Sequence, residues 1–154
     1  MKAAADTIKH VTLELGGKSP LIIFDDADLK NAVKGALMAN FFTQGQVCSN
    51  AARVFVQRGI YLEFLQAFKD QTMKMKIGDP FNEDTTVGAT ITKEHAEKVL
   101  GYIKSAVDEG AKIECGGERV LLEGMLINKV KSYQLQHSKR ESLTSHLSKF
   151  TSKM

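Results

Sequence analysis

Leu21-Ile22-Ile23-Phe24-Asp25-Asp26-Ala27-Asp28-Leu29 is the stretch of sequence that decides the fold class. Its first four residues form a compact apolar run, which is typical of a strand buried on both faces of a parallel sheet. The aspartates that follow can accept hydrogen bonds from the free amides at the start of a helix. Because apolar residues then recur at helical spacing, we expect an amphipathic helix that continues to about Phe42.

Strands and helices continue to alternate further along the chain. Arg53 to Gln57 has the composition of a strand, and apolar residues from Tyr61 to Met75 recur at helical spacing. The proline of Gly78-Asp79-Pro80 lacks an amide hydrogen, so we expect the second helix to end there. Thr92 can cap a third helix, and Gly110 is suited to stop it.

Two further strands complete the expected sheet. Ala111 to Cys115 follows the third helix and leads into the turn Gly116-Gly117, while Val11 to Leu15 is a β-rich run that ends at Gly16-Gly17. Alternating strands and helices of this length imply right-handed crossovers. The predicted fold class is therefore α/β, with helices packed on a largely parallel sheet.

The last thirty residues differ from the rest of the chain in charge and pattern. The chain has 154 residues and a formal charge of +3, but residues 125–154 contain six basic side chains and one acidic, so the tail carries +5 and the remainder −2. The tail has no proline or glycine and its apolar residues keep no period, which favours a marginal helix or disorder. We expect a domain over residues 1–124 and a divergent basic tail outside it.

Several classes of protein are disfavoured by composition. The tail places only Tyr133 and Phe150 among its lysines and serines, which is too little for a nucleic-acid surface. No segment approaches the roughly 18 consecutive apolar residues that span a bilayer. The two cysteines and four histidines have no metal-ligand or disulfide spacing, and helix capping explains the Asp25, Asp26 and Asp28 run more simply than a metal does. We expect a soluble cytoplasmic protein with no bound metal.

A cysteine and a carboxylate provide the candidate chemistry. Cys48 closes the short loop Thr43-Gln44-Gly45-Gln46-Val47-Cys48, and Glu14 lies just before the double glycine Gly16-Gly17. A thiolate attacks carbonyl carbon, and a nearby carboxylate can accept a proton from the thiol or from water. A lone cysteine is more often a buried, inert thiol, and we assign that role to Cys115.

These motifs together resemble the catalytic half of the aldehyde dehydrogenase superfamily. The resemblance covers roughly residues 8 to 120, and residues 38–48 most resemble the betaine aldehyde and trimethylaminobutyraldehyde branch. The segments that carry it are Val11-Thr12-Leu13-Glu14-Leu15-Gly16-Gly17-Lys18-Ser19-Pro20, Asp25 to Leu29, Gly45-Gln46-Val47-Cys48, Arg53 to Gln57, and Gly78-Asp79-Pro80.

The resemblance implies a reaction and a role for four residues. Cys48 is the nucleophile, which attacks a small-molecule aldehyde to give a thiohemiacetal and then a thioester, with hydride passing to NAD or NADP. Glu14 activates the hydrolytic water, and the backbone at Leu15 and Gly16 lies against the nicotinamide. The resemblance also implies that the parent enzyme is a homo-oligomer.

The chain departs from the family pattern at both ends. The amino-terminal half that seats the cofactor phosphates has no counterpart, and the basic tail stands where the family continues into another strand. The Gly-Pro usual near residue 88 is Gly88-Ala89. We therefore expect a fragment of a longer enzyme that is inactive alone. The alternatives are a non-catalytic truncated module that associates with a full-length relative and, with less support, a thiol esterase that needs no cofactor.

Overall fold

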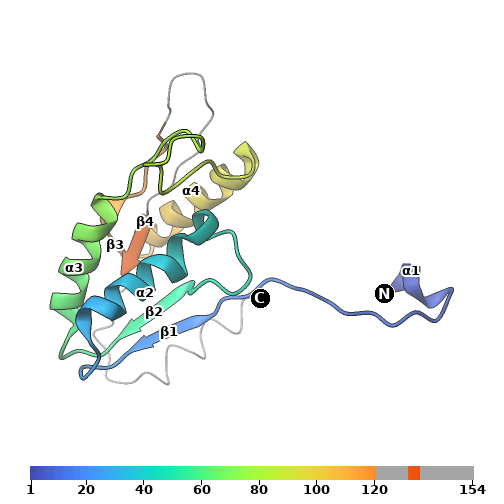
Figure 1. The fold of residues 1–154 in the computed structure, drawn as a ribbon, viewed down its shortest axis with the longest axis horizontal. Helices are drawn as coiled ribbons and strands as arrows, with labels where there is room; N and C mark the ends of the chain where they lie inside the picture. Colours follow the sequence, from blue (N-terminus) through green and yellow to red (C-terminus); the bar gives the residue numbers. More distant parts are fainter. Residues whose placement is uncertain (121–131, 136–154) are drawn as a thin grey trace.

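The computed structural model describes residues 1–120 and the backbone of residues 132–135. Figure 1 shows helices α2 and α3 side by side next to the paired strands β1 and β2, with α4, β3 and β4 adjoining. In chain order the elements are α1 Lys2–Ala5, β1 Pro20–Ile23, α2 Leu29–Phe41, the 3-10 turn η1 Phe42–Gly45, β2 Arg53–Val56, α3 Tyr61–Met73, α4 Lys93–Asp108, β3 Lys112–Gly116 and β4 Ser132–Leu135.

The unit that positions the candidate site is the parallel pair β1 and β2 with α2 as its crossover. Leu21 is opposite Val54 and Ile23 is opposite Val56, which confirms the predicted parallel pairing. Of the three aspartates after β1, Asp28 caps α2 by accepting a hydrogen bond from the Asn31 amide at 2.7 Å. The predicted strand-to-helix transition is confirmed. The predicted burial of this strand on both faces is wrong, because successive side chains point to opposite faces and those of Ile22 and Phe24 are 50% and 60% exposed.

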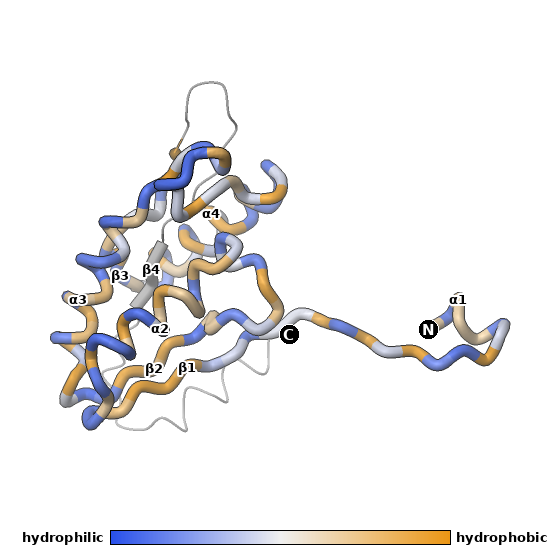
Figure 2. Tube along the Cα trace, viewed as in Figure 1, coloured by the Kyte–Doolittle hydropathy of each residue, from blue (hydrophilic) through white to orange (hydrophobic). Residues whose placement is uncertain are grey.

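The core lies between this strand pair and the two helices α2 and α3. Figure 2 shows that β1 and β2 are the most continuously hydrophobic part of the described chain. Phe64 and Phe68 of α3 stack with ring centroids 5.4 Å apart, and both are almost fully buried. The buried residues of this cluster are Ile23, Val33, Ala36, Ile60, Phe64 and Phe68.

The second half of the described chain agrees with the sequence in its helix caps but not in its sheet. The strand predicted at Ala111 to Cys115 forms as β3, but among the described strands it pairs antiparallel with β4 and does not join β1 and β2. Thr92 caps α4 through its hydroxyl, which accepts from the His95 amide at 3.1 Å, and Gly110 follows the helix with a φ of +93°. However, α3 ends at Met73, before the predicted stop at Gly78-Asp79-Pro80. The helix ends early because the Lys74 amide turns back to the Gln71 and Thr72 carbonyls, closing the last turn tightly.

The strand β4 was not expected. Ser132–Leu135 pairs antiparallel with β3, so these four residues contradict the expectation of an unpaired tail. Lys112 and Ile113 of β3 pair with Leu135 and Gln134 of β4. Pairing with an existing strand can stabilise β4 although the apolar residues of the tail keep no period. The remaining residues of the predicted tail lie outside the described residues, and the boundary at 124 stays a prediction.

The segment before β1 is an extended arm. Val11 to Leu15 does not form the predicted strand, because none of these residues pairs with another described strand. Figure 1 shows the arm leading from β1 away from the body to α1. Val11, Leu13 and Leu15 are 42%, 54% and 70% exposed, so the alternation that predicted a strand has no sheet to join. None of the described helices is long and apolar enough to cross a membrane.

Candidate active site

The loop that carries Cys48 begins with three residues in the left-handed backbone region. Thr43, Gln44 and Gly45 have φ values of 49°, 57° and 79°, directly after helix α2. Glycine adopts this region freely, whereas a β-branched threonine does so at a cost. A surrounding structure must therefore hold this turn in place, and such strain is often found at functional sites.

Part of that support comes from the end of α2 and the start of β2. The Asn50 side-chain amide donates to the Phe42 carbonyl at 3.0 Å, and the Ala51 amide donates to the Ala39 carbonyl at 2.8 Å. The Asn50 amide also donates to the Val47 carbonyl at 3.2 Å. These bonds close the loop on itself, so that Cys48 lies in a compact turn between α2 and β2.

The remaining support comes from two glutamines and the segment before α4. Gln46 accepts a hydrogen bond from the Ile91 amide at 3.0 Å, and its own amide nitrogen donates to the Thr43 carbonyl at 3.2 Å. In the amide orientation that satisfies both groups, Gln44 accepts from the Gly88 amide at 3.0 Å. Both glutamine side chains thus join the cysteine loop to residues 88–91.

The glycine turn that follows Glu14 meets the cysteine loop at Gly17. A Cβ added to Gly17 would lie 2.6 Å from the backbone oxygen of Cys48, which is closer than any real Cβ contact. The adjacent Gly16 has no atom within 4 Å of an added Cβ. The Arg53 amide then donates to the Ser19 carbonyl at 3.4 Å, which continues the approach into the start of β2. The two predicted motifs therefore pack backbone against backbone.

The structure does not connect the carboxylate of Glu14 to the thiol. Glu14 lies on the exposed arm and makes no hydrogen bond or ion pair with the residues that the structure describes. Leu15 is 70% exposed beside it. The fold instead places Gly17, three residues after Glu14, next to Cys48. The roles assigned to Glu14, Leu15 and Gly16 stay predictions.

The two cysteines occupy different environments. Cys48 is exposed, whereas Cys115 is half-buried on β3. An accessible thiol can reach a substrate or a reagent, whereas a packed thiol is slower to react. The assignment of Cys48 as the chemically available cysteine therefore agrees with its exposure.

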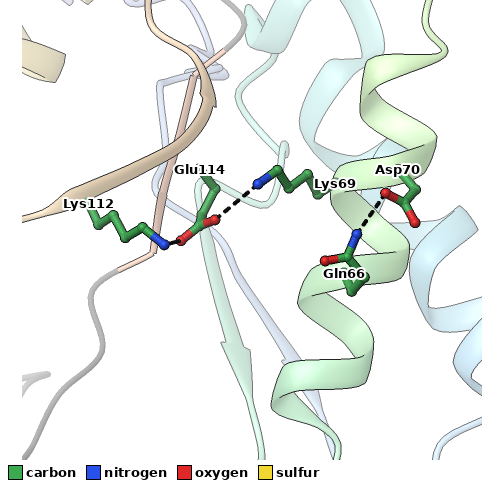
Figure 3. Close-up of polar contacts among 5 residues, drawn as sticks. All are labelled: Gln66, Lys69, Asp70, Lys112 and Glu114. Atoms are coloured by element: carbon green, nitrogen blue, oxygen red, sulfur yellow. Dashed lines mark hydrogen bonds and ion pairs between the residues drawn. The ribbon is translucent and has the colours of Figure 1, made fainter.

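The clearest electrostatic perturbation lies between α3 and β3. Figure 3 shows Glu114 between Lys112 and Lys69, with Lys69 reaching from α3 at 3.4 Å. The hydrogen bond from Lys112 holds the pKa of Glu114 below its ordinary value, and partial burial raises the pKa of Tyr61 nearby. Since these groups join a helix to a strand, they form a structural link. Within residues 1–120 no three potential ligands gather as a metal site would require.

Some site residues could not have been found in the sequence. Gly88 and Ile91 contribute backbone amides, so their side-chain identity carries no signal, and Gly88-Ala89 stood out only as a departure from a family pattern. Gln44 and Gln46 do carry a signal, since both flank the left-handed glycine of the loop. The close approach of Gly17 to Cys48 shows that Gly17, and not Gly16, is the glycine that must lack a side chain.

Comparison with known proteins decides the family. The model of the aldehyde dehydrogenase family matches residues 1–132. The chain belongs to this family. Among curated relatives of this aldehyde dehydrogenase chain, 4-trimethylaminobutyraldehyde dehydrogenase A of Danio rerio is 60% identical over 77% of the chain, and 4-trimethylaminobutyraldehyde dehydrogenase of Homo sapiens is 59% identical over the same share.

Solved aldehyde dehydrogenases agree with the fold. A betaine aldehyde dehydrogenase from Staphylococcus aureus, solved in complex with NAD+, is 41% identical and gives a TM-score of 0.77. The match covers 85% of this chain and 26% of the Staphylococcus aureus chain. An NAD-dependent aldehyde dehydrogenase from Sinorhizobium meliloti gives a TM-score of 0.80 at 38% identity and covers 86% of this chain and 26% of its own. The chain spans 23% and 24% of the two curated relatives, so it corresponds to about a quarter of their length.

Proposed function

We propose that this chain carries the nucleophile of an NAD(P)-dependent aldehyde dehydrogenase that oxidises an aldehyde to a carboxylic acid. The observation that supports it most directly is the packing of Gly17 against Cys48, which joins the two motifs of the family at an exposed thiol. A chance cysteine loop would have no reason to meet the glycine turn that follows the candidate base. The family match over residues 1–132 supports the same reaction class.

The proposed reaction proceeds on the sulfur of Cys48. The thiolate attacks the aldehyde carbon, a carbon–sulfur bond forms and the carbonyl oxygen takes the electron pair, giving a thiohemiacetal. Bound NAD or NADP would supply an acceptor for the hydride on that carbon, and loss of the hydride would leave a thioester on Cys48. Water then attacks the thioester carbon, Glu14 takes a proton from this water, and cleavage of the carbon–sulfur bond releases the acid and the Cys48 thiolate. The Cys48 backbone amide can stabilise the oxyanion.

The described residues fit only one end of a dinucleotide. Space is open around Gly16, where an added Cβ would meet nothing within 4 Å, so a planar nicotinamide can approach the backbone of Leu15 and Gly16. NAD or NADP would supply the hydride acceptor there. Because the resemblance assigns no other cofactor contact to the described residues, we expect the 154-residue protein to form no NADH with an aldehyde on its own.

The names of the relatives support a substrate class. Relatives named 4-trimethylaminobutyraldehyde dehydrogenase are 59% and 60% identical to this chain, and a structural neighbour is named betaine aldehyde dehydrogenase. Both names describe aldehydes with a quaternary ammonium group. We therefore propose such an aldehyde for the longer enzyme. The resemblance further suggests a homo-oligomer, and the composition favours a cytoplasmic protein.

Selective alkylation of the full chain tests the proposal. Iodoacetamide is added at neutral pH, and the modification of the Cys48 and Cys115 peptides is followed by mass spectrometry. We expect Cys48 to react about tenfold faster, because it is exposed and held in a structured turn. Equal rates for the two thiols in folded protein would contradict the assignment of Cys48 as nucleophile. Cys48→Ser, with Cys115 unchanged, provides the matched control.

A non-catalytic role is the second candidate, and the arm is the observation that favours it. The exposed Val11, Leu13 and Leu15 alternate along the arm, and β1 pairs with β2 alone among the described strands. An open groove of about 350 Å³ between β1 and α2 adds apolar surface. Such edges and surfaces favour association with another chain. Co-expression with a full-length relative followed by pull-down tests this role, and absence of association would exclude it.

A further inference from the structure

Two glutamine side chains link the cysteine loop to a segment more than forty positions away. Gln46 accepts from the Ile91 amide at 3.0 Å across a separation of 45 positions, and Gln44 accepts from the Gly88 amide at 3.0 Å. Both acceptors are on the loop and both donors are backbone groups of residues 88–91. The link therefore depends on the glutamines and not on the side chains opposite them.

The loop needs such a link because its backbone is strained. Thr43 and Gln44 adopt positive φ values that only glycine adopts freely, and the strained turn lies just before Cys48. The Gln46 side chain holds this turn from a second direction, since its nitrogen donates to the Thr43 carbonyl at 3.2 Å. One amide thus connects the strained residue to the distant segment.

Residues 88–91 form a firm anchor because both ends of this segment are fixed. Before it, Val87 forms a parallel bridge with Ile77 and is 5% exposed. After it, Thr92 caps the sixteen-residue helix α4. A hydrogen bond to this segment therefore fixes the cysteine loop relative to helix α4 and to the Ile77–Val87 bridge.

We propose that Gln44 and Gln46 are positioning residues for Cys48, which hold its loop in the reactive geometry by fixing the left-handed turn to residues 88–91. This inference rests on the proposed function, because it takes Cys48 to be the nucleophile. Neither glutamine acts on the substrate. A displacement of a reacting group by about 1 Å can cost roughly a hundredfold in rate, so fixing the loop has a chemical consequence.

A double-mutant cycle on the full chain tests the inference from both sides of the hydrogen bond. Q46A removes the acceptor, whereas I91P removes the donated amide hydrogen and also restrains the backbone at residues 90 and 91. I91A is the matched control for I91P, since it keeps the amide and the Ile91 side chain is 79% exposed. Q71A, on the exposed surface of α3, is the control for loss of a glutamine. The readouts are the iodoacetamide rate of Cys48 relative to Cys115 and the exchange rate of the Ile91 amide.

We expect Q46A and I91P each to lower the relative Cys48 rate by about threefold or more. The double variant should lower it no further than Q46A, because Q46A already removes the Gln46–Ile91 hydrogen bond that I91P removes. Q46A should accelerate Ile91 exchange about tenfold, while I91A and Q71A leave the rates unchanged. An unchanged Cys48 rate in Q46A, or an unchanged Ile91 exchange rate, overturns the inference even if I91P fails to fold. A wild-type Cys48 that reacts no faster than Cys115 overturns the proposed function instead, and with it the positioning role.

Discussion

Gly17 lies against the backbone carbonyl of Cys48, and the two residues leave no room for a side chain between them. A Cβ on Gly17 would come within 2.6 Å of that oxygen, whereas one on Gly16 would meet nothing within 4 Å. The neighbouring glycines are therefore not equivalent. Gly17 allows the arm to approach the cysteine loop, while Gly16 leaves space open.

The first prediction uses this difference. Gly17→Ala forces the arm and the Cys48 loop apart, because the obstructing atom belongs to the backbone and cannot rotate away. We expect the iodoacetamide rate of Cys48 to change by about threefold or more. Gly16→Ala adds the same methyl group in open space and should leave the rate unchanged. Equal rates for the two variants would show that the contact does not influence the thiol.

The second prediction concerns the cap of α2. Asp28→Ala removes the hydrogen bond to the Asn31 amide at 2.7 Å, so we expect the free energy of unfolding to fall by about 1 kcal/mol. Asp28→Asn keeps an acceptor and should recover most of this loss. Asp26→Ala changes an exposed aspartate that does not cap the helix. Urea denaturation measures all three, and equal losses for Asp26→Ala and Asp28→Ala would contradict the capping role.

The third prediction concerns the core. Phe64 is 2% exposed and stacks on Phe68, so Phe64→Ala should destabilise the fold by about 3 to 5 kcal/mol through lost burial and a cavity. Such a loss is a large fraction of the roughly 5 to 15 kcal/mol typical of a domain. Leu62→Ala, on the same helix at 76% exposure, should change stability by less than about 0.5 kcal/mol. Similar melting temperatures for the two variants would place the core elsewhere.

The fourth prediction concerns acid stability. The hydrogen bond from Lys112, and then the one from Lys69, lowers the pKa of Glu114 in the folded protein below the ordinary value of 4.5. A carboxyl group with a lowered folded pKa stabilises the fold fully above its unfolded pKa, and this contribution is lost as the pH falls through the folded pKa. The stability advantage of the wild type over Glu114→Gln should therefore be constant from pH 7 to about pH 4.5 and shrink below that.

Chemical denaturation at several pH values measures this advantage. Glu83→Gln, in an exposed loop, is the matched control for the loss of one carboxyl group. An advantage of the wild type over Glu114→Gln that persists unchanged to pH 3 would contradict the assigned role of the two lysines.

Local patterns predicted the elements that pack against each other. Asp28 and Thr92 were recognisable as helix caps because capping depends on side chains near in sequence. Leu21 to Phe24 was recognisable as a strand from its apolar run, but the run did not reveal that one of its faces is exposed. Val11 to Leu15 has an equally good strand pattern, yet it has no partner among the described strands. A strand forms only when two segments pair, so the pattern of Val11 to Leu15 alone could not show whether this segment would find a partner.

The candidate site was predictable only in part, for a related reason. Cys48 is a side chain with chemistry, and it stood out in the sequence. The amides of Gly88 and Ile91 are common to nearly every residue, so their part in the loop depends on geometry that no local pattern encodes. The absence of a Glu14 contact likewise follows from the course of the arm.

The pairing of β1 with β2 also has a consequence for how the chain folds. Asp25 and Gln57 join the ends of these strands and are 32 positions apart. The Gln57 side chain accepts from the Asp25 backbone amide and donates to the Asp25 carboxylate. Helix α2 can form within about a microsecond from local contacts, but the strands must wait until the intervening chain has closed. The order of events should therefore be helix first and parallel ladder second, so that Cys48, at the far end of α2, reaches its final surroundings late in folding.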